Sequence, residues 1–149
     1  MGTTRPSNVI ITLISIAYII LFVYTAVSKL MHLSQFQLRL ERMPYMESIA
    51  PWVAFGVPFV ELVITGLLLI PKYRLIAFHA CLGLMTLFTA YSAIVLNFSE
   101  SIPCSCGGVI SAMGWKVHIL FNAFFILLAL LAIFQIKKHK AQLSKQHTT

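Results

Sequence analysis

Residues 9–27 read VIITLISIAYIILFVYTAV, nineteen residues without a charged side chain. About 20 helical residues cross the hydrocarbon core of a bilayer, and within lipid the backbone must satisfy its own hydrogen bonds. This run therefore predicts a transmembrane helix. It is too long for the apolar part of a typical signal peptide, and no small-x-small cleavage sequence follows it, so we expect the helix to be retained.

Three further apolar runs of similar length lie at residues 52–70, 75–96 and 117–136, and Glu61 is the one charged side chain within the four runs. The whole chain is 59% apolar and 10% charged, whereas a soluble domain carries about 25% charged residues. We predict an all-α membrane protein, an antiparallel four-transmembrane-helix bundle forming a single domain over residues 1–149. Its expected spans are about 9–30, 51–70, 75–97 and 115–136.

Lysine and arginine are divided unequally between the two sides of this bundle. Four spans place both termini and the middle loop on one side, which carries seven basic residues, whereas the other side carries four basic residues and three glutamates. By the positive-inside rule, both termini are cytoplasmic. We interpret the net charge of +7 as a topology signal, and we expect the basic tail at 137–149 to be frayed and to contact anionic lipid. We predict no nucleic-acid partner.

The first outer loop, residues 32–50, is the longest of the connections between the predicted spans. Phe36, Leu40 and Met43 recur there at helical spacing among polar side chains, and Pro44 follows them. Apolar residues on one face of a short polar helix are typical of a helix that lies in the membrane interface, and proline ends a helix. We expect a short interfacial helix in this loop.

The second outer loop carries the sequence PCSCGG at residues 103–108. A disulfide between Cys104 and Cys106 would close a small, strained ring, and strained, exposed disulfides tend to be the labile, catalytic kind. A structural disulfide gains more stability from a longer loop. The spacing favours a redox-active pair, with a metal-ligand pair and a structural clip as the open alternatives.

The third cysteine differs from this pair. Cys81 lies near the inner end of the third run, about 20 Å or more from Cys104 by helical rise, too far for a disulfide. We predict that Cys81 is a small buried hydrophobic residue. His118, at the outer end of the fourth run, is the candidate that raises the thiolate fraction of the outer cysteines, and Asn122 lies one turn deeper on the same face.

Glu61 is the one acid inside a span. Intramembrane carboxylates are costly and usually face the bundle interior or a polar cavity. Three roles stay open for Glu61: helix packing, proton relay, or part of a quinone-like headgroup site. By helical rise, the side chains expected at a depth similar to that of Glu61 are His79, Thr86 and Asn122. Lys29 lies higher, but its long side chain could extend inward to Glu61. Trp115 belongs to an aromatic belt at the outer interface, and Trp115 and Asn122 are the candidate cofactor-binding residues.

Three sequence pieces resemble one family. FVYTAVSKL at 22–30 followed by Phe36, and Glu61-Leu62 followed by GLLL at 66–69, resemble the first and second helices of the MauE/DoxX-like membrane proteins. PCSCGG followed by Trp115, His118 and Phe121-Asn122 resembles the MauE-type, redox-associated branch. The resemblance implies a four-helix bundle in the bacterial inner membrane and a role in thiol–disulfide balance outside the cytoplasm, as in maturation of methylamine dehydrogenase. Its DoxX-like side implies a link to quinone.

Together these features predict a membrane thiol–disulfide redox protein. Cys104 and Cys106, assisted by His118 and Glu61, would exchange disulfides with a periplasmic thioredoxin-like partner or a Cys-containing client. Quinone is the candidate cofactor. The first alternative is a non-enzymatic scaffold or maturation factor in which the cysteines form a structural clip. The second is soft-metal handling by the two cysteines and His118, because thiolates select copper(I) or zinc; we assign no metal ligands.

Overall fold

The structure is a computed structural model that describes residues 6–43, 45–98 and 115–146. Within these ranges every regular element is helical, which confirms the all-α prediction. In chain order the elements are α1 (Pro6–Met31), α2 (Leu33–Glu41), the 3-10 turn η1 (Glu47–Ile49), α3 (Ala50–Leu69), the 3-10 turn η2 (Pro71–Tyr73), α4 (Arg74–Phe98) and α5 (Trp115–Gln146).

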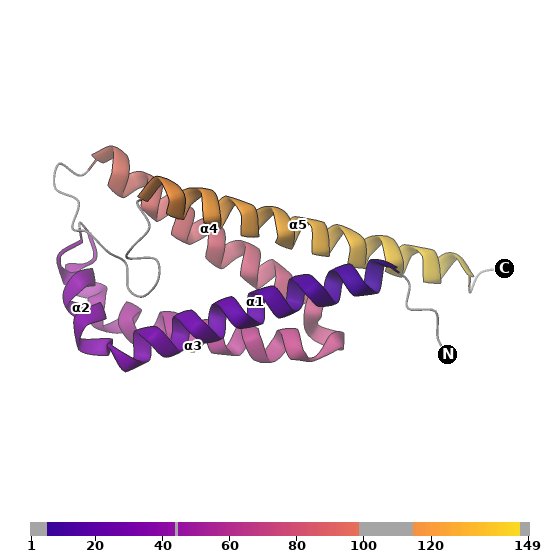
Figure 1. The fold of residues 1–149 in the computed structure, drawn as a ribbon, viewed down its shortest axis with the longest axis horizontal. Helices are drawn as coiled ribbons and strands as arrows, with labels where there is room; N and C mark the ends of the chain where they lie inside the picture. Colours follow the sequence, from indigo (N-terminus) through magenta and orange to yellow (C-terminus); the bar gives the residue numbers. More distant parts are fainter. Residues whose placement is uncertain (1–5, 44, 99–114, 147–149) are drawn as a thin grey trace.

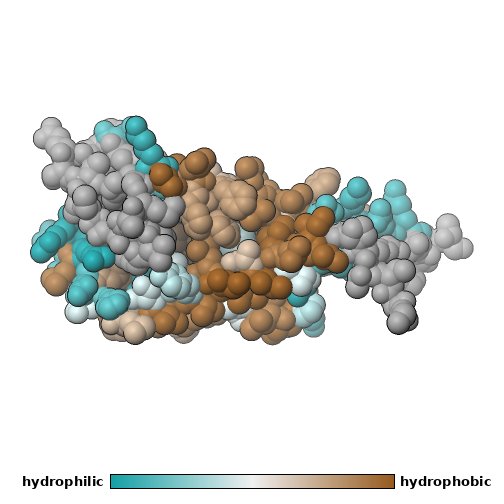
Figure 2. All heavy atoms as spheres, in the orientation of Figure 1, coloured by the Kyte–Doolittle hydropathy of each residue, from teal (hydrophilic) through white to brown (hydrophobic). Residues whose placement is uncertain are grey.

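Among the described residues, four helices are long and apolar enough to cross a membrane: α1, α3, α4 and α5. Many of their outward-facing side chains are large and apolar; Leu127 and Phe134 are each 65% exposed. Figure 2 shows the result as a hydrophobic band across the middle of the molecule, with hydrophilic residues toward both ends. A soluble monomer rarely exposes such a surface, so lipid is its natural solvent. The prediction of four helices able to cross a membrane is confirmed.

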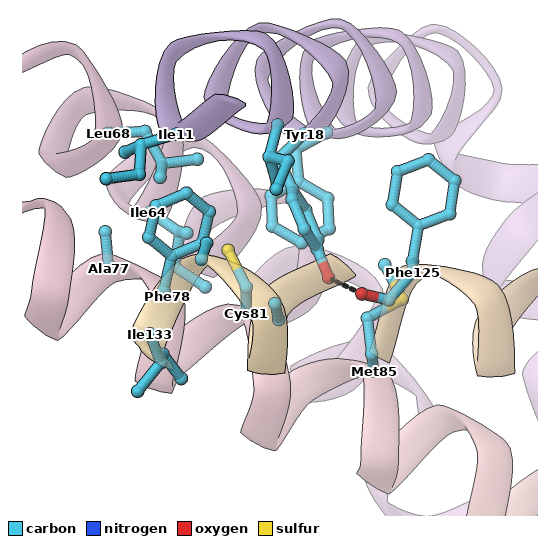
Figure 3. Close-up of a cluster of buried hydrophobic side chains, with 14 residues drawn as sticks. Ile11, Tyr18, Ile64, Leu68, Ala77, Phe78, Cys81, Met85, Phe125 and Ile133 are labelled. Carbon is cyan, nitrogen blue, oxygen red and sulfur yellow. Dashed lines mark hydrogen bonds between the residues drawn. The ribbon is translucent and has the colours of Figure 1, made fainter. Parts of the chain in front are cut away.

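The four long helices pack around a common apolar core. α1 contacts α3 and α5, and α4 contacts the same two helices. Each helix contributes to one buried cluster, which includes Tyr18 from α1, Ile64 from α3, Phe78 from α4 and Phe125 from α5 (Figure 3). The start of α1 and the end of α5 lie at one end of the bundle, and α2 lies at the other (Figure 1). Side chains that share a depth on different helices can therefore meet in the interior.

The segment after α1 forms a short helix that turns back onto α3. Phe36 and Leu40 of α2 are buried together with Ala50 and Ala54 at the start of α3, and Met43 is also buried. The three apolar residues recognised by their helical spacing are thus the ones that face the protein. The small alanines allow α2 to pack closely against α3. The position of α2 relative to a membrane interface stays a prediction.

The end of α5 differs from the sequence-based expectation. We expected the polar tail after Lys137 to be frayed, but α5 continues as a helix to Gln146. The residues in this extension, mainly Lys, Gln, Ala and Leu, have high helix propensity. Lysines near the C-terminus of a helix also interact favourably with its dipole. Polarity of the tail therefore marks the end of the apolar surface and not the end of the helix.

Candidate functional site

Glu61 lies on the inward-facing stripe of α3. Glu61 follows Pro58 by about one helical turn, and the residue as a whole is only 1% exposed. The buried positions of α3 recur at intervals of three and four residues, which is the spacing of one helix face: Ala50, Ala54, Pro58, Glu61, Ile64, Thr65 and Leu68. The acid therefore faces the bundle interior, where an ionised carboxylate needs a partner.

That partner is Lys29 from the end of α1. Its Nζ atom lies 2.5 Å from Oε1 of Glu61, with the lysine side chain 16% exposed and the glutamate side chain 2% exposed. A short contact of this kind is a charge-assisted hydrogen bond. The lysine side chain reaches inward from the last turn of α1 and joins α1 to α3. Because both groups are largely removed from solvent, removal of either would leave a buried charge without its counter-charge.

Two aromatic rings surround the ammonium group of Lys29. The Nζ atom lies 5.9 Å from the ring centroid of Phe36 in α2 and 5.5 Å from that of Phe88 in α4. Cations within about 6 Å of an aromatic ring are attracted by its electron-rich face. Lys29 thus interacts with side chains from α2, α3 and α4, and its charge is held in a site that these helices build together.

Two buried polar atoms in the described part of the bundle have no hydrogen-bond partner there. They are Oε2 of Glu61 and Nδ2 of Asn122. The hydroxyl group of Thr25 also lies beside the Glu61 carboxylate, although it donates to the carbonyl oxygen of Phe22 at 3.3 Å. Unsatisfied buried polar atoms cost free energy and require an explanation, of which a catalytic or ligand-binding role is one. Glu61 and Asn122 are candidates for such a role.

His118 extends this polar group to α5. Its side chain is partly buried in the first turns of α5, and it lies within electrostatic range of the Lys29 ammonium group. Asn122 follows one turn later on the same face of the helix. The structure therefore brings the imidazole of His118 near the charged region formed by Lys29 and Glu61, at the end of the bundle where α2 lies.

Two of the partners considered for Glu61 face away from it. His79 is exposed, and its Nδ1 atom lies 2.7 Å from the carbonyl oxygen of Leu75 in its own helix. Thr86 is also exposed and donates to the carbonyl oxygen of Leu82 at 2.7 Å. Both hydrogen bonds are local to α4. Equal depth in the membrane was therefore insufficient to make either residue a partner of Glu61.

Cys81 is fully buried in the core and carries a free thiol, as predicted for a small hydrophobic residue. Figure 3 shows it close to Tyr18, whose hydroxyl donates a 2.6 Å hydrogen bond to the carbonyl oxygen of Phe125. The sequence analysis did not single out Tyr18. A tyrosine near the centre of an apolar run, away from the interface, is the signal that could have identified it, because a buried phenol needs an acceptor.

The remaining predicted site residues are Cys104, Cys106 and Trp115. Cys104 and Cys106 lie outside the described residues. Trp115 is the first residue of α5, and its side chain also lies outside the described part of the structure. Along the chain, the two cysteines fall between the end of α4 at Phe98 and the start of α5.

Comparison with known proteins gives one match. The family model described as methylamine utilisation protein MauE matches residues 7–135. The matched range runs from the start of α1 through the apolar part of α5 and includes the segment with Cys104 and Cys106. No curated protein and no solved structure matches the chain.

Proposed function

Because the chain belongs to the MauE family and is a multi-pass membrane protein, we propose that it is a thiol–disulfide redox protein of the bacterial inner membrane. Cys104 and Cys106 form its reactive pair and exchange disulfides with a periplasmic thioredoxin-like protein or a Cys-containing client. The observation that carries this proposal is the buried Lys29–Glu61 pair near His118. A bundle that only anchored a loop would gain little from holding these charges in its interior.

The exchange chemistry conserves electrons between protein and client. A client thiolate attacks one sulfur of the Cys104–Cys106 disulfide, which breaks the S–S bond and gives a mixed disulfide plus one protein thiolate. A second client thiolate attacks the mixed disulfide. The client leaves with a disulfide, and the protein pair holds two electrons and takes up two protons. The reverse sequence reduces a client.

The charged region supplies what this chemistry needs. A positive charge near a cysteine raises its thiolate fraction, and His118 is the titratable side chain at the start of α5 that can supply or remove a proton. Glu61 is a second proton acceptor, because only one of its carboxylate oxygens is hydrogen-bonded to Lys29. Both groups lie on helices, which hold them in place more firmly than a loop would.

Quinone is the proposed cofactor. The unpaired Nδ2 group of Asn122 is a buried donor, and a quinone carbonyl is an acceptor that suits it. Asn122, with Trp115 seven positions earlier in the sequence of α5, would hold the headgroup. A bound quinone would supply a two-electron, two-proton acceptor for the thiol pair. The protein's part is to orient the ring, exclude water and hold the proton at Glu61 or His118.

The proposed membrane arrangement is an antiparallel bundle with both termini in the cytoplasm, α2 in the outer interface and the cysteines on the periplasmic side. The distribution of charge supports this arrangement: the side that carries the termini has seven basic residues, and the other side has four. The start of α1 and the end of α5 also lie at one end of the bundle, opposite α2 (Figure 1).

Topology can be tested with reporters fused after Thr149. We expect a fluorescent protein that folds only in the cytoplasm to be active there, and alkaline phosphatase at the same position to be inactive, because the basic residues hold that end inside. Fusions at Glu100, in the second outer loop, serve as the control and should give the opposite pattern. Active phosphatase after Thr149 would overturn the proposed orientation.

The redox state of the cysteine pair tests the function itself. In purified protein without reductant, we expect a maleimide to leave Cys104 and Cys106 unmodified, because they are joined. Mild dithiol should open the pair and allow both to react, whereas Cys81 should react only after denaturation because it is fully buried. Titration against a glutathione or dithiothreitol buffer then gives the reduction potential of the pair. A pair that stays oxidised in mild dithiol indicates a structural clip, and release of a metal ion on labelling indicates a metal site.

A further inference from the structure

A pocket of about 410 Å³ lies at the end of the bundle opposite α2. It is formed where the start of α1, the turn η2, the start of α4 and the late part of α5 come together. Its polar lining consists of Asn8, Lys72, Arg74, His139 and Lys140. None of the residues assigned above to the redox site belongs to it.

The pocket gathers positive charge without a balancing acid. Lys72, Arg74 and Lys140 are basic residues. The four acids of the chain are Glu41, Glu47, Glu61 and Glu100, and none occurs in the segments that form the pocket. Cations held near one another repel unless an anion lies between them. The charge pattern therefore favours an anionic ligand.

Arg74 is positioned by the fold to bind such a ligand. Its Nε atom donates to the carbonyl oxygen of Leu68 at 3.3 Å, and a terminal nitrogen donates to the hydroxyl of Thr12 at 3.4 Å. A guanidinium group has five N–H donors, and these two bonds are the ones it makes within the described residues. The remaining donors are held in a planar arrangement that matches the oxygen atoms of a phosphate.

The rest of the pocket is apolar. Ile11, Leu75 and Ile136 line it from α1, α4 and α5, and each belongs to a helix long enough to cross the membrane. A soluble phosphate would contact the basic side chains but not the apolar part of the lining. A phospholipid uses both parts, since its headgroup lies at the membrane surface and its chains extend along the apolar helices. Basic pockets between transmembrane helices bind anionic headgroups for this reason.

We propose that this pocket binds the phosphate-bearing headgroup of an anionic phospholipid, contacting Arg74, Lys72 and Lys140. The acyl chains run along the half-buried side chains of Leu75 and Ile136. The bound lipid would offset part of this positive charge and fasten the start of α1 and the late part of α5 to the turn between α3 and α4. The site is independent of the proposed redox function.

Lipid binding can be measured by native mass spectrometry on the full-length, delipidated protein in a non-ionic detergent. We expect phosphatidylglycerol to be retained more strongly than phosphatidylcholine, which has the same phosphate but no net charge. Arg74→Gln and Lys140→Gln should each weaken phosphatidylglycerol binding about fivefold, the effect of one basic residue near the membrane surface. Lys138→Gln is the matched control: it removes the same charge from the same helix at a position that does not line the pocket, and it should leave binding unchanged.

Three results would overturn the proposal. One is equal retention of the two lipids by the wild-type protein. Another is a loss in Lys138→Gln as large as that in Lys140→Gln, which would indicate a general charge effect. The third is binding of glycerol phosphate or inorganic phosphate as tight as that of phosphatidylglycerol, which would assign the site to a soluble ligand. Should Arg74→Gln fail to fold, Lys140→Gln decides, because Lys140 is exposed.

Discussion

Lys29→Met is expected to lower the free energy of unfolding by about 3–5 kcal/mol, the usual effect of removing one partner from a buried ion pair. The substitution keeps an unbranched side chain of similar length and removes the ammonium group, with its charge and its hydrogen bond to Glu61. Glu61, 2% exposed at its side chain, would then be ionised without a counter-charge or would have to take up a proton. The measurement is an unfolding titration with sodium dodecyl sulfate in mixed micelles.

Two further variants distinguish the ion pair from simple packing. Lys29→Met combined with Glu61→Leu removes both charges, and we expect it to recover most of the lost stability, because apolar replacement of a whole buried pair is often close to neutral. Lys116→Met is the matched control: it changes an exposed lysine at the start of α5 and should alter stability little. If the double variant were as unstable as the sum of the single variants, the two side chains would not be energetically coupled.

The stable double variant also reveals what the pair does for activity. If it folds and still exchanges disulfides at the wild-type rate, the Lys29–Glu61 pair holds α1 and α3 together and has no part in proton transfer. If it folds but loses activity, the carboxylate takes part in the chemistry. Glu61→Gln completes the comparison, because it keeps the shape of the side chain and removes its ability to accept a proton.

Cys104→Ser and Cys106→Ser are each expected to reduce disulfide exchange to the uncatalysed background. A serine hydroxyl cannot form a disulfide, and it is not ionised at neutral pH as an activated thiol is. Loss of one cysteine also leaves no disulfide within the pair for a client thiolate to attack in the first step. The assay follows the oxidation or reduction of a thioredoxin-like protein by the purified chain in lipid nanodiscs.

Cys81→Ala is the control for this experiment. Cys81 is fully buried in the core between the long helices, so its loss should reduce stability slightly and leave exchange intact. Exchange that persists in both outer-cysteine variants but disappears in Cys81→Ala would refute the proposed redox pair. Unchanged exchange in all three would mean that the cysteines do not carry the reaction.

Glu61 illustrates how far the sequence could define the site. A lone acid in an apolar run is identifiable without coordinates, because burying a carboxylate in lipid is expensive and the residue must face the interior. Its partner was not identifiable. The rise per residue of a helix gives the depth of a side chain in the membrane but not the direction in which it points. By depth alone, the possible partners of Glu61 were His79, Thr86, Asn122 and Lys29. In the structure His79 and Thr86 are exposed and bond to their own helix, whereas Lys29 points inward from the end of α1.

Tyr18 and Arg74 show the same limit at other positions. The hydrogen bond from Tyr18 to the carbonyl oxygen of Phe125 joins residues separated by 107 positions, so no local pattern could predict it. Arg74 was interpreted only as part of the basic inner loop. Its contacts with Leu68 and Thr12, and its position in a pocket with residues of α5, depend on how four helices meet.

The sequence by itself determined that the chain has four apolar helices suited to lipid, that Glu61 is the exceptional acid among them, and that Cys81 is a small buried residue. These properties depend on the length and composition of single segments. The hydrophobicity of a segment is the sum over its own residues, and it does not depend on which other segments lie beside it. Only the tertiary structure decided which side chains meet: Lys29 with Glu61, Tyr18 with Phe125, and the cations of η2 and α4 with those of α5. Such contacts depend on the rotation of each helix about its own axis and on its tilt against its neighbours, which are set by side-chain packing between segments far apart in the chain.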